Sequence, residues 1–106
     1  MNLIKLIKYF RSGGTFENFC LSQSINMDSE VVEIYMTKPF GINNELGFFE
    51  IEKTEAKIEY YFNGKMYFNL FDFFYFLDAI EEANIGISLT DEKLAQVLFD
   101  YAINDA

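Results

Sequence analysis

The residues of this 106-residue chain that could carry out chemistry are few, and the main candidates are carboxylates. Glu50 and Glu52 are two positions apart, which on a β-strand places both on one face about 7 Å apart. That separation could suit a glycosidase-like pair of acid and base. Such a pair works only inside a substrate cleft, and the chain is too short to build one around a polar strand face. We therefore expect structural or binding roles for both.

Histidine is absent from the chain, which excludes Ser-His-Asp and Cys-His catalysis and histidine-based metal sites. Cys20 is the single cysteine, so no disulfide can form within the chain, and no imidazole can activate its thiol. The glycines form neither a phosphate-binding loop nor a dinucleotide fingerprint, and no calcium-loop pattern is present. We expect no enzymatic activity, no catalytic residue, no cofactor and no metal ion.

Composition indicates one folded domain over residues 1–106, since 51% of the residues are hydrophobic and 19% are aromatic. Eight basic residues against seventeen acidic ones give a net charge of −9. Residues 1–11 hold three basic and no acidic residues, so the rest of the chain carries −12. A field of this sign repels phosphate backbones and anionic membranes, and it attracts basic proteins. We expect neither nucleic-acid nor membrane binding.

The N-terminal segment is apolar and basic, but lysines interrupt it too often for the hydrophobic region of a signal peptide. The spacing of Leu3, Ile7 and Phe10 is that of an amphipathic helix, which we expect to pack on the protein's own core. No apolar stretch reaches the roughly 18 residues that span a bilayer. Together with the lone thiol, these features predict a cytoplasmic protein.

Hydrophobic periodicity predicts helices that flank a group of strands. The expected helices cover about 2–11, 15–21, 70–83 and 90–103, with Thr15, Asn69 and Thr90 as N-caps. The expected strands cover about 30–36, 46–52, 57–62 and 65–69. This order predicts an α+β fold in which an antiparallel sheet of three to four strands packs against the terminal helices.

The last two strands are predicted to form a hairpin around Asn63-Gly64, in one of two registers. A two-residue turn places Tyr60 opposite Tyr67 and mixes polar with apolar residues on both faces. A three-residue loop with a bulge at Gly64 pairs Tyr60 with Met66 and sorts the faces better. We therefore predict the three-residue loop.

One face of the predicted sheet carries tyrosines and carboxylates. It comprises Glu33, Tyr35, Glu50, Glu52, Glu59, Tyr61 and Tyr67. The face is either an ordinary solvent face or a recognition surface, on which tyrosines give contact area and carboxylates select basic groups. In the second case, changing Glu33 or Glu59 to lysine should weaken partner binding and leave the fold intact.

In size, acidity, aromatic richness and lack of catalytic residues, the chain resembles the immunity proteins of bacterial toxin systems, especially contact-dependent growth inhibition. The resemblance implies a protein that neutralises one cognate toxin, for example a nuclease with a basic active site, by charge-complementary binding. The expected partner is therefore a basic toxin domain.

Two alternatives remain open. A small acidic secretion chaperone or adaptor would act as a dimer through an apolar surface, for which Phe48, Phe71 and Phe76 are candidates if they are exposed. An enzyme that uses carboxylates alone would depend on Glu50.

Overall fold

The computed structural model describes residues 1–38, 41–85 and 89–104, and it has the predicted α+β fold. Four strands form one antiparallel sheet: β1 (Val32–Thr37), β2 (Leu46–Glu50), β3 (Glu59–Phe62) and β4 (Lys65–Asp72). The helices of the described residues are α1 (Leu3–Arg11), α2 (Phe16–Ser22), α3 (Ile51–Thr54), α4 (Phe73–Ile85) and α5 (Asp91–Asn104).

The sheet has the strand order β2-β1-β4-β3, so β2 and β3 form its two edges. Residues 51–58, which include α3, connect one edge to the other and must therefore pass across the sheet. The hydroxyl group of Tyr35, on the central strand β1, donates to the carbonyl oxygen of Lys57 at 2.6 Å. This connection therefore covers part of one face, which we call the outer face.

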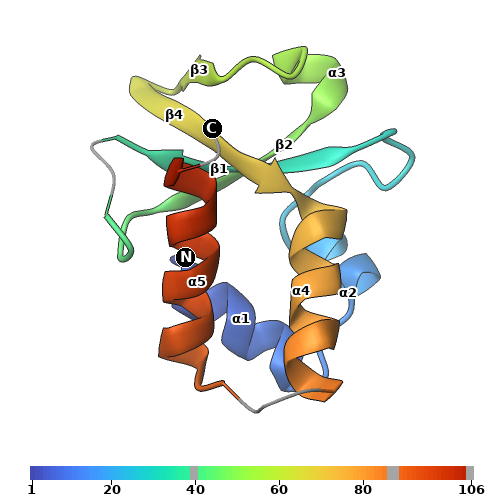
Figure 1. The fold of residues 1–106 in the computed structure, drawn as a ribbon. Coiled ribbons are helices and arrows are strands. Elements are labelled where there is room, and N and C mark those ends of the chain that lie inside the picture. The colour runs from blue at the N-terminus through green and yellow to red at the C-terminus, as the bar shows by residue number, and fades with distance from the viewer. Residues whose placement is uncertain (39–40, 86–88, 105–106) are drawn as a thin grey trace.

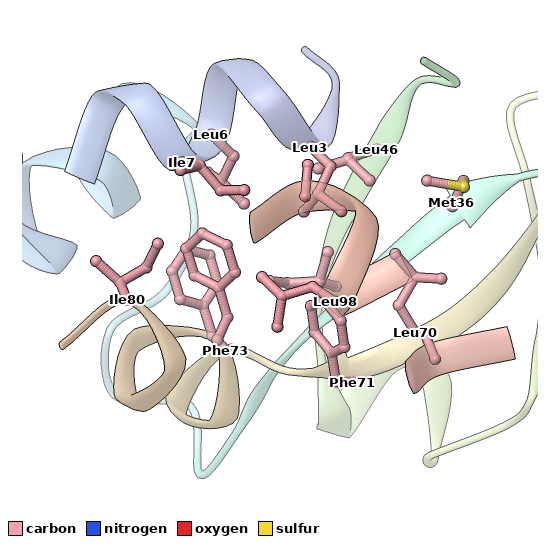
Figure 2. Packing of buried hydrophobic residues seen from close by; sticks show 14 of the residues in the cluster. Leu3, Leu6, Ile7, Met36, Leu46, Leu70, Phe71, Phe73, Ile80 and Leu98 are labelled. Carbon is pink, nitrogen blue, oxygen red and sulfur yellow. The ribbon is translucent and has the colours of Figure 1, made fainter. Parts of the chain in front are cut away.

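The opposite face of the sheet packs against α1, α2, α4 and α5, which lie together on one side of it (Figure 1). Side chains from these helices and from the strands point toward one another in the main core (Figure 2). Phe73 is completely buried there, and its ring contacts those of Phe10, Phe16, Phe19 and Phe48 at centroid distances of 5.0 to 5.9 Å. Aromatic edge contacts of this kind add to the free energy gained by burial.

The N-termini of three helices follow the capping chemistry of the sequence. Thr15 and Thr90 accept hydrogen bonds from the backbone N–H groups of Asn18 and Lys93, as predicted. The cap of α4 is Asp72, which accepts from the N–H of Tyr75 at 2.7 Å, so the prediction that Asn69 caps this helix is wrong. Residues 70 and 71 belong instead to β4, which runs to Asp72 and carries both side chains into the core.

Two other predicted boundaries differ from the structure. The strand predicted over 46–52 ends at Glu50, where the chain turns into the short helix α3. The strand predicted from residue 57 begins at Glu59, because the preceding residues form the connection across the outer face.

The hairpin register predicted from face sorting is also wrong. Tyr60 pairs with Tyr67 and Tyr61 with Met66, around the two-residue turn Asn63-Gly64. Both turn residues have positive φ, 49° and 77°, as a type I′ turn requires, and this turn matches the twist of the strands. Face sorting failed here because β3 is a largely exposed edge strand, so the core does not dictate which of its residues point which way.

Candidate protein-binding surface

Glu33 and Tyr35 lie on the outer face, as predicted, but neither is available to a partner. Tyr35 is fully buried and Glu33 is 9% exposed. The carboxylate of Glu33 accepts from Thr54 Oγ1 at 3.3 Å and from Asn69 Nδ2 at 2.7 Å. These bonds tie the sheet to α3, so the two residues hold the connection in place.

Tyr67 joins Tyr35 in a second, smaller core on the outer face, together with Phe49 and the half-buried Tyr60. Gly47 makes room for this cluster, because a Cβ atom there would lie 2.7 Å from the ring of Phe49 and 2.8 Å from that of Tyr67. Burial raises the pKa of both the Tyr35 and the Tyr67 hydroxyl groups. Two of the predicted recognition residues, Tyr35 and Tyr67, therefore belong to a packed aromatic layer.

Glu50 and Glu52 do not share a strand face. Glu50 pairs with Val32, whose side chain lies in the main core, so it points to the helix side of the sheet. Glu52 lies in α3 and accepts hydrogen bonds from the hydroxyl group of Ser29 and the N–H of Glu30. The Ser29 bond is the main reason that the pKa of Glu52 is lowered. The predicted carboxylate pair does not form, because β2 ends between the two residues.

Glu59 and Tyr61 are exposed, but they too point to the helix side. Glu59 pairs with Phe68, which pairs in turn with the core residue Met36, and Tyr61 lies on the same side of β3. Glu59 forms an ion pair with Lys38 at 3.1 Å. Of the seven predicted residues, the structure thus brings only Glu33, Tyr35 and Tyr67 together on one face, and all three are buried.

The apolar surface considered for a dimeric adaptor is not formed either. Phe71 and Phe76 are 7% and 0% exposed, and Phe48 packs against the main core.

A different surface emerges between α4 and α5. The two helices stand side by side, and α1 packs against both of them from behind (Figure 1). The groove between them is lined by Tyr75, Ala79, Glu82, Ala83, Leu89, Leu94, Val97 and Leu98. Small alanine side chains keep it open on the α4 side, and Val97 on the α5 side is 55% exposed. The rings of Tyr75 and Tyr101 stack at 4.8 Å and join the two helices near the sheet.

Exposed carboxylates without an ion partner lie on α4, and one of them, Glu82, lines this groove. Asp78, Glu81 and Glu82 on α4 are exposed, and no described residue forms an ion pair or hydrogen bond with them. Asp78 and Glu82 follow Tyr75 at helical spacing, which places them along the rim of the groove. Among the other described carboxylates, eight have partners through side-chain bonds: Glu33, Glu45, Glu50, Glu52, Glu59, Asp72, Asp91 and Asp100. The remaining five, which are dispersed over other elements, have none among described residues: Glu17, Asp28, Glu30, Glu55 and Glu92.

The positions of these three carboxylates are unfavourable for the helix itself. Asp78 lies three and four residues before Glu81 and Glu82, a spacing at which like charges repel. The last turn of a helix also disfavours negative charge, and the last turn of α4 contains Glu82 and no basic residue. A surface that departs from helix preferences in this way is a candidate for function.

This surface was not predicted from the sequence. The charges of α4 are visible in the sequence, but the groove depends on how far α4 and α5 stand apart, which no local pattern encodes. What the sequence does contain is a helix without a single basic residue and with its three acidic residues at positions 78, 81 and 82.

Other chemistry is limited within the described part of the chain. Cys20 is buried, and burial, followed by the nearby charge of Glu50, raises the pKa of its thiol, so little thiolate forms at neutral pH. Residues 1–38, 41–85 and 89–104 contain no group of three side chains arranged to hold a metal ion. None of the described helices is both long and apolar enough to cross a bilayer.

Comparison of the chain with protein-family models, with curated proteins and with solved structures gives no match.

Proposed function

We propose that this chain is a non-enzymatic protein-binding module that holds a basic amphipathic helix of a partner protein in the groove between α4 and α5. The observation that carries the proposal is the group of three unpaired carboxylates on α4, two of which, Asp78 and Glu82, lie along the rim of an apolar groove. Apolar side chains of such a helix would fill the groove, and its lysines or arginines would meet Asp78, Glu81 and Glu82.

The resemblance to immunity proteins supplies the biological context of this proposal. A toxin with a basic, phosphate-binding domain offers the positive charge that the α4 surface selects, and complementary charge speeds association. Binding would neutralise the toxin in the cytoplasm of the cell that makes both proteins. The dimeric adaptor has less support, because the phenylalanines considered for its surface are largely buried.

Two matched variants test the proposal. The first, Asp78→Asn/Glu81→Gln/Glu82→Gln, removes the three charges of α4. The second, Asp28→Asn/Glu30→Gln/Glu55→Gln, removes one aspartate and two glutamates that are exposed, lie outside α4 and α5, and have no ion partner among described residues. Both variants change the net charge by the same amount.

Each tagged protein is expressed in the native host and purified. We expect one stoichiometric partner, with a basic domain, to co-purify with the parent and the second variant but not with the first. A stoichiometric acidic partner, or equal recovery by both variants, would overturn the proposed mode of binding.

A further inference from the structure

The free edge of β3 carries unpaired backbone groups. Asn69 N–H donates to the carbonyl oxygen of Ile58, whereas the carbonyl oxygen of Met66 accepts from Lys38 N–H on the other side of β4. Because backbone groups alternate in direction along a strand, the backbone groups of Ile58, Tyr60 and Phe62 point toward β4. The backbone N–H and C=O groups of Glu59 and Tyr61 therefore point outward. No hydrogen bond joins these groups to any described residue.

This edge is short but lacks two features that often protect sheet edges, a proline and a β-bulge. β3 contains no proline, and its pairing with β4 shows no bulge. Its side chains are exposed and apolar around the single charge of Glu59: Ile58 is 63% exposed, Tyr61 65% and Phe62 43%. At the other edge of the sheet, by contrast, Leu46 N–H donates to the carbonyl oxygen of Met1, so the N-terminal segment covers part of β2.

Charge opposes the approach of a second copy of this chain less at the β3 edge than over the rest of the surface. Two copies that each carry −9 repel one another over most of their surface. Residues 57–69, however, hold Lys57, Lys65 and Glu59 as their only charges, so this hairpin is close to neutral. It is therefore a region where two copies can approach with little repulsion.

The order of residues in β3 fits antiparallel pairing with itself. If two β3 strands pair about a two-fold axis through Tyr60, Glu59 of each copy bonds Tyr61 of the other through their outward backbone groups. Ile58 then lies opposite Phe62, and no like charges are opposed. On the outer face, Tyr60 and Phe62 lie 5.0 and 5.2 Å from Phe49, so the aromatic clusters of the two copies would become continuous.

We propose that two copies of this chain associate through their β3 edges in this register, which joins their sheets into one. The edge is short, so the interface lies at the small end of the range for protein pairs, below about 1,200 Å². The dimer should therefore dissociate reversibly on dilution. This proposal is independent of the α4 surface, since none of its residues lies on α4 or α5.

Sedimentation equilibrium over a concentration series tests the register through one exposed position. Tyr61→Lys places a lysine opposite Glu59 of the other copy, and the two-fold axis forms this pair twice. The dissociation constant of the dimer should therefore fall by roughly two- to thirty-fold. Tyr61→Glu places a carboxylate there and should weaken the dimer by a similar factor. Both variants should fold, because Tyr61 is exposed.

Amide hydrogen exchange gives a second readout of the same pairing. The N–H groups of Glu59 and Tyr61 should exchange more slowly as the concentration of the parent protein rises. The proposal is overturned if the parent protein remains monomeric at millimolar concentration. That result is expected if the β3 edge binds only an extended segment of another protein. Equal dimerisation of the two Tyr61 variants would also overturn it.

Discussion

Tyr35 and Tyr67 lie in the same aromatic cluster, but their hydroxyl groups have different surroundings. The Tyr35 hydroxyl donates to Lys57 at 2.6 Å and so fastens the 51–58 connection to the sheet. The Tyr67 hydroxyl has no hydrogen-bond partner among the described residues. The two tyrosines should therefore respond differently to the loss of a hydroxyl group.

We expect Tyr35→Phe to lower the free energy of unfolding at pH 7 by about 1 kcal/mol, because the hydrogen bond to the Lys57 carbonyl oxygen is lost. Tyr67→Phe should change it by less than about 0.5 kcal/mol. Burial raises the pKa of Tyr67 in the folded state, so its neutral hydroxyl group contributes to stability at any pH below the ordinary tyrosine pKa. This stabilisation is lost as pH rises through the pKa of the folded state. In urea unfolding at pH 8 and pH 11, the free energy of unfolding of Tyr67→Phe should rise relative to that of the parent at the higher pH. The same difference at both pH values would contradict this.

Glu33 illustrates how a surface prediction can fail at a single residue. Its carboxylate is buried and accepts bonds from two different elements, so Glu33→Lys should cost at least about 3 kcal/mol and leave much of the protein unfolded. The exposed Glu59→Lys is the matched control and should cost less than about 1 kcal/mol. Thermal unfolding followed by circular dichroism would compare them, and similar melting temperatures would argue against the buried network.

At the scale of elements, the hairpin turn has the clearest conformational requirement. Gly64 has φ of +77°, and a Cβ atom there would meet no other atom within 4 Å, so only backbone strain opposes a side chain. We expect Gly64→Ala to lower the free energy of unfolding by about 1 kcal/mol, measured by urea denaturation. A loss of less than about 0.4 kcal/mol would contradict the turn geometry.

Elements with strong local signals were predicted well from the sequence. The helices over 3–11, 16–22 and 91–104 have clear periodicity and caps, and the alternation of β1 correctly separated Val32, Ile34 and Met36 from Glu33 and Tyr35. The burial of the predicted recognition face could not be foreseen, because it depends on the path of residues 51–58 across the sheet. That path follows from the strand order β2-β1-β4-β3, which local patterns do not encode.

At the scale of the whole molecule, the acidic charge is distributed differently from the prediction. The sheet hairpin is nearly neutral, whereas α4 and α5 together hold Asp78, Glu81, Glu82, Asp91, Glu92 and Asp100 against the single Lys93. Asp91 is paired with Arg11 at 3.0 Å, which ties α5 to α1. This distribution agrees with the two proposals, a basic partner on the helical side and a second copy of the chain at the β3 edge.

The most direct test of the α4 surface is equilibrium binding of a synthetic amphipathic helix of leucine and lysine, measured by titration calorimetry at several salt concentrations. The parent and Asp28→Asn/Glu30→Gln/Glu55→Gln should bind it with similar affinity, which should fall as salt screens the charges. Asp78→Asn/Glu81→Gln/Glu82→Gln should bind at least about tenfold more weakly, since three charge contacts of roughly 0.5 kcal/mol or more are lost. Equal affinities for the two triple variants would contradict the claim that α4 selects a basic partner.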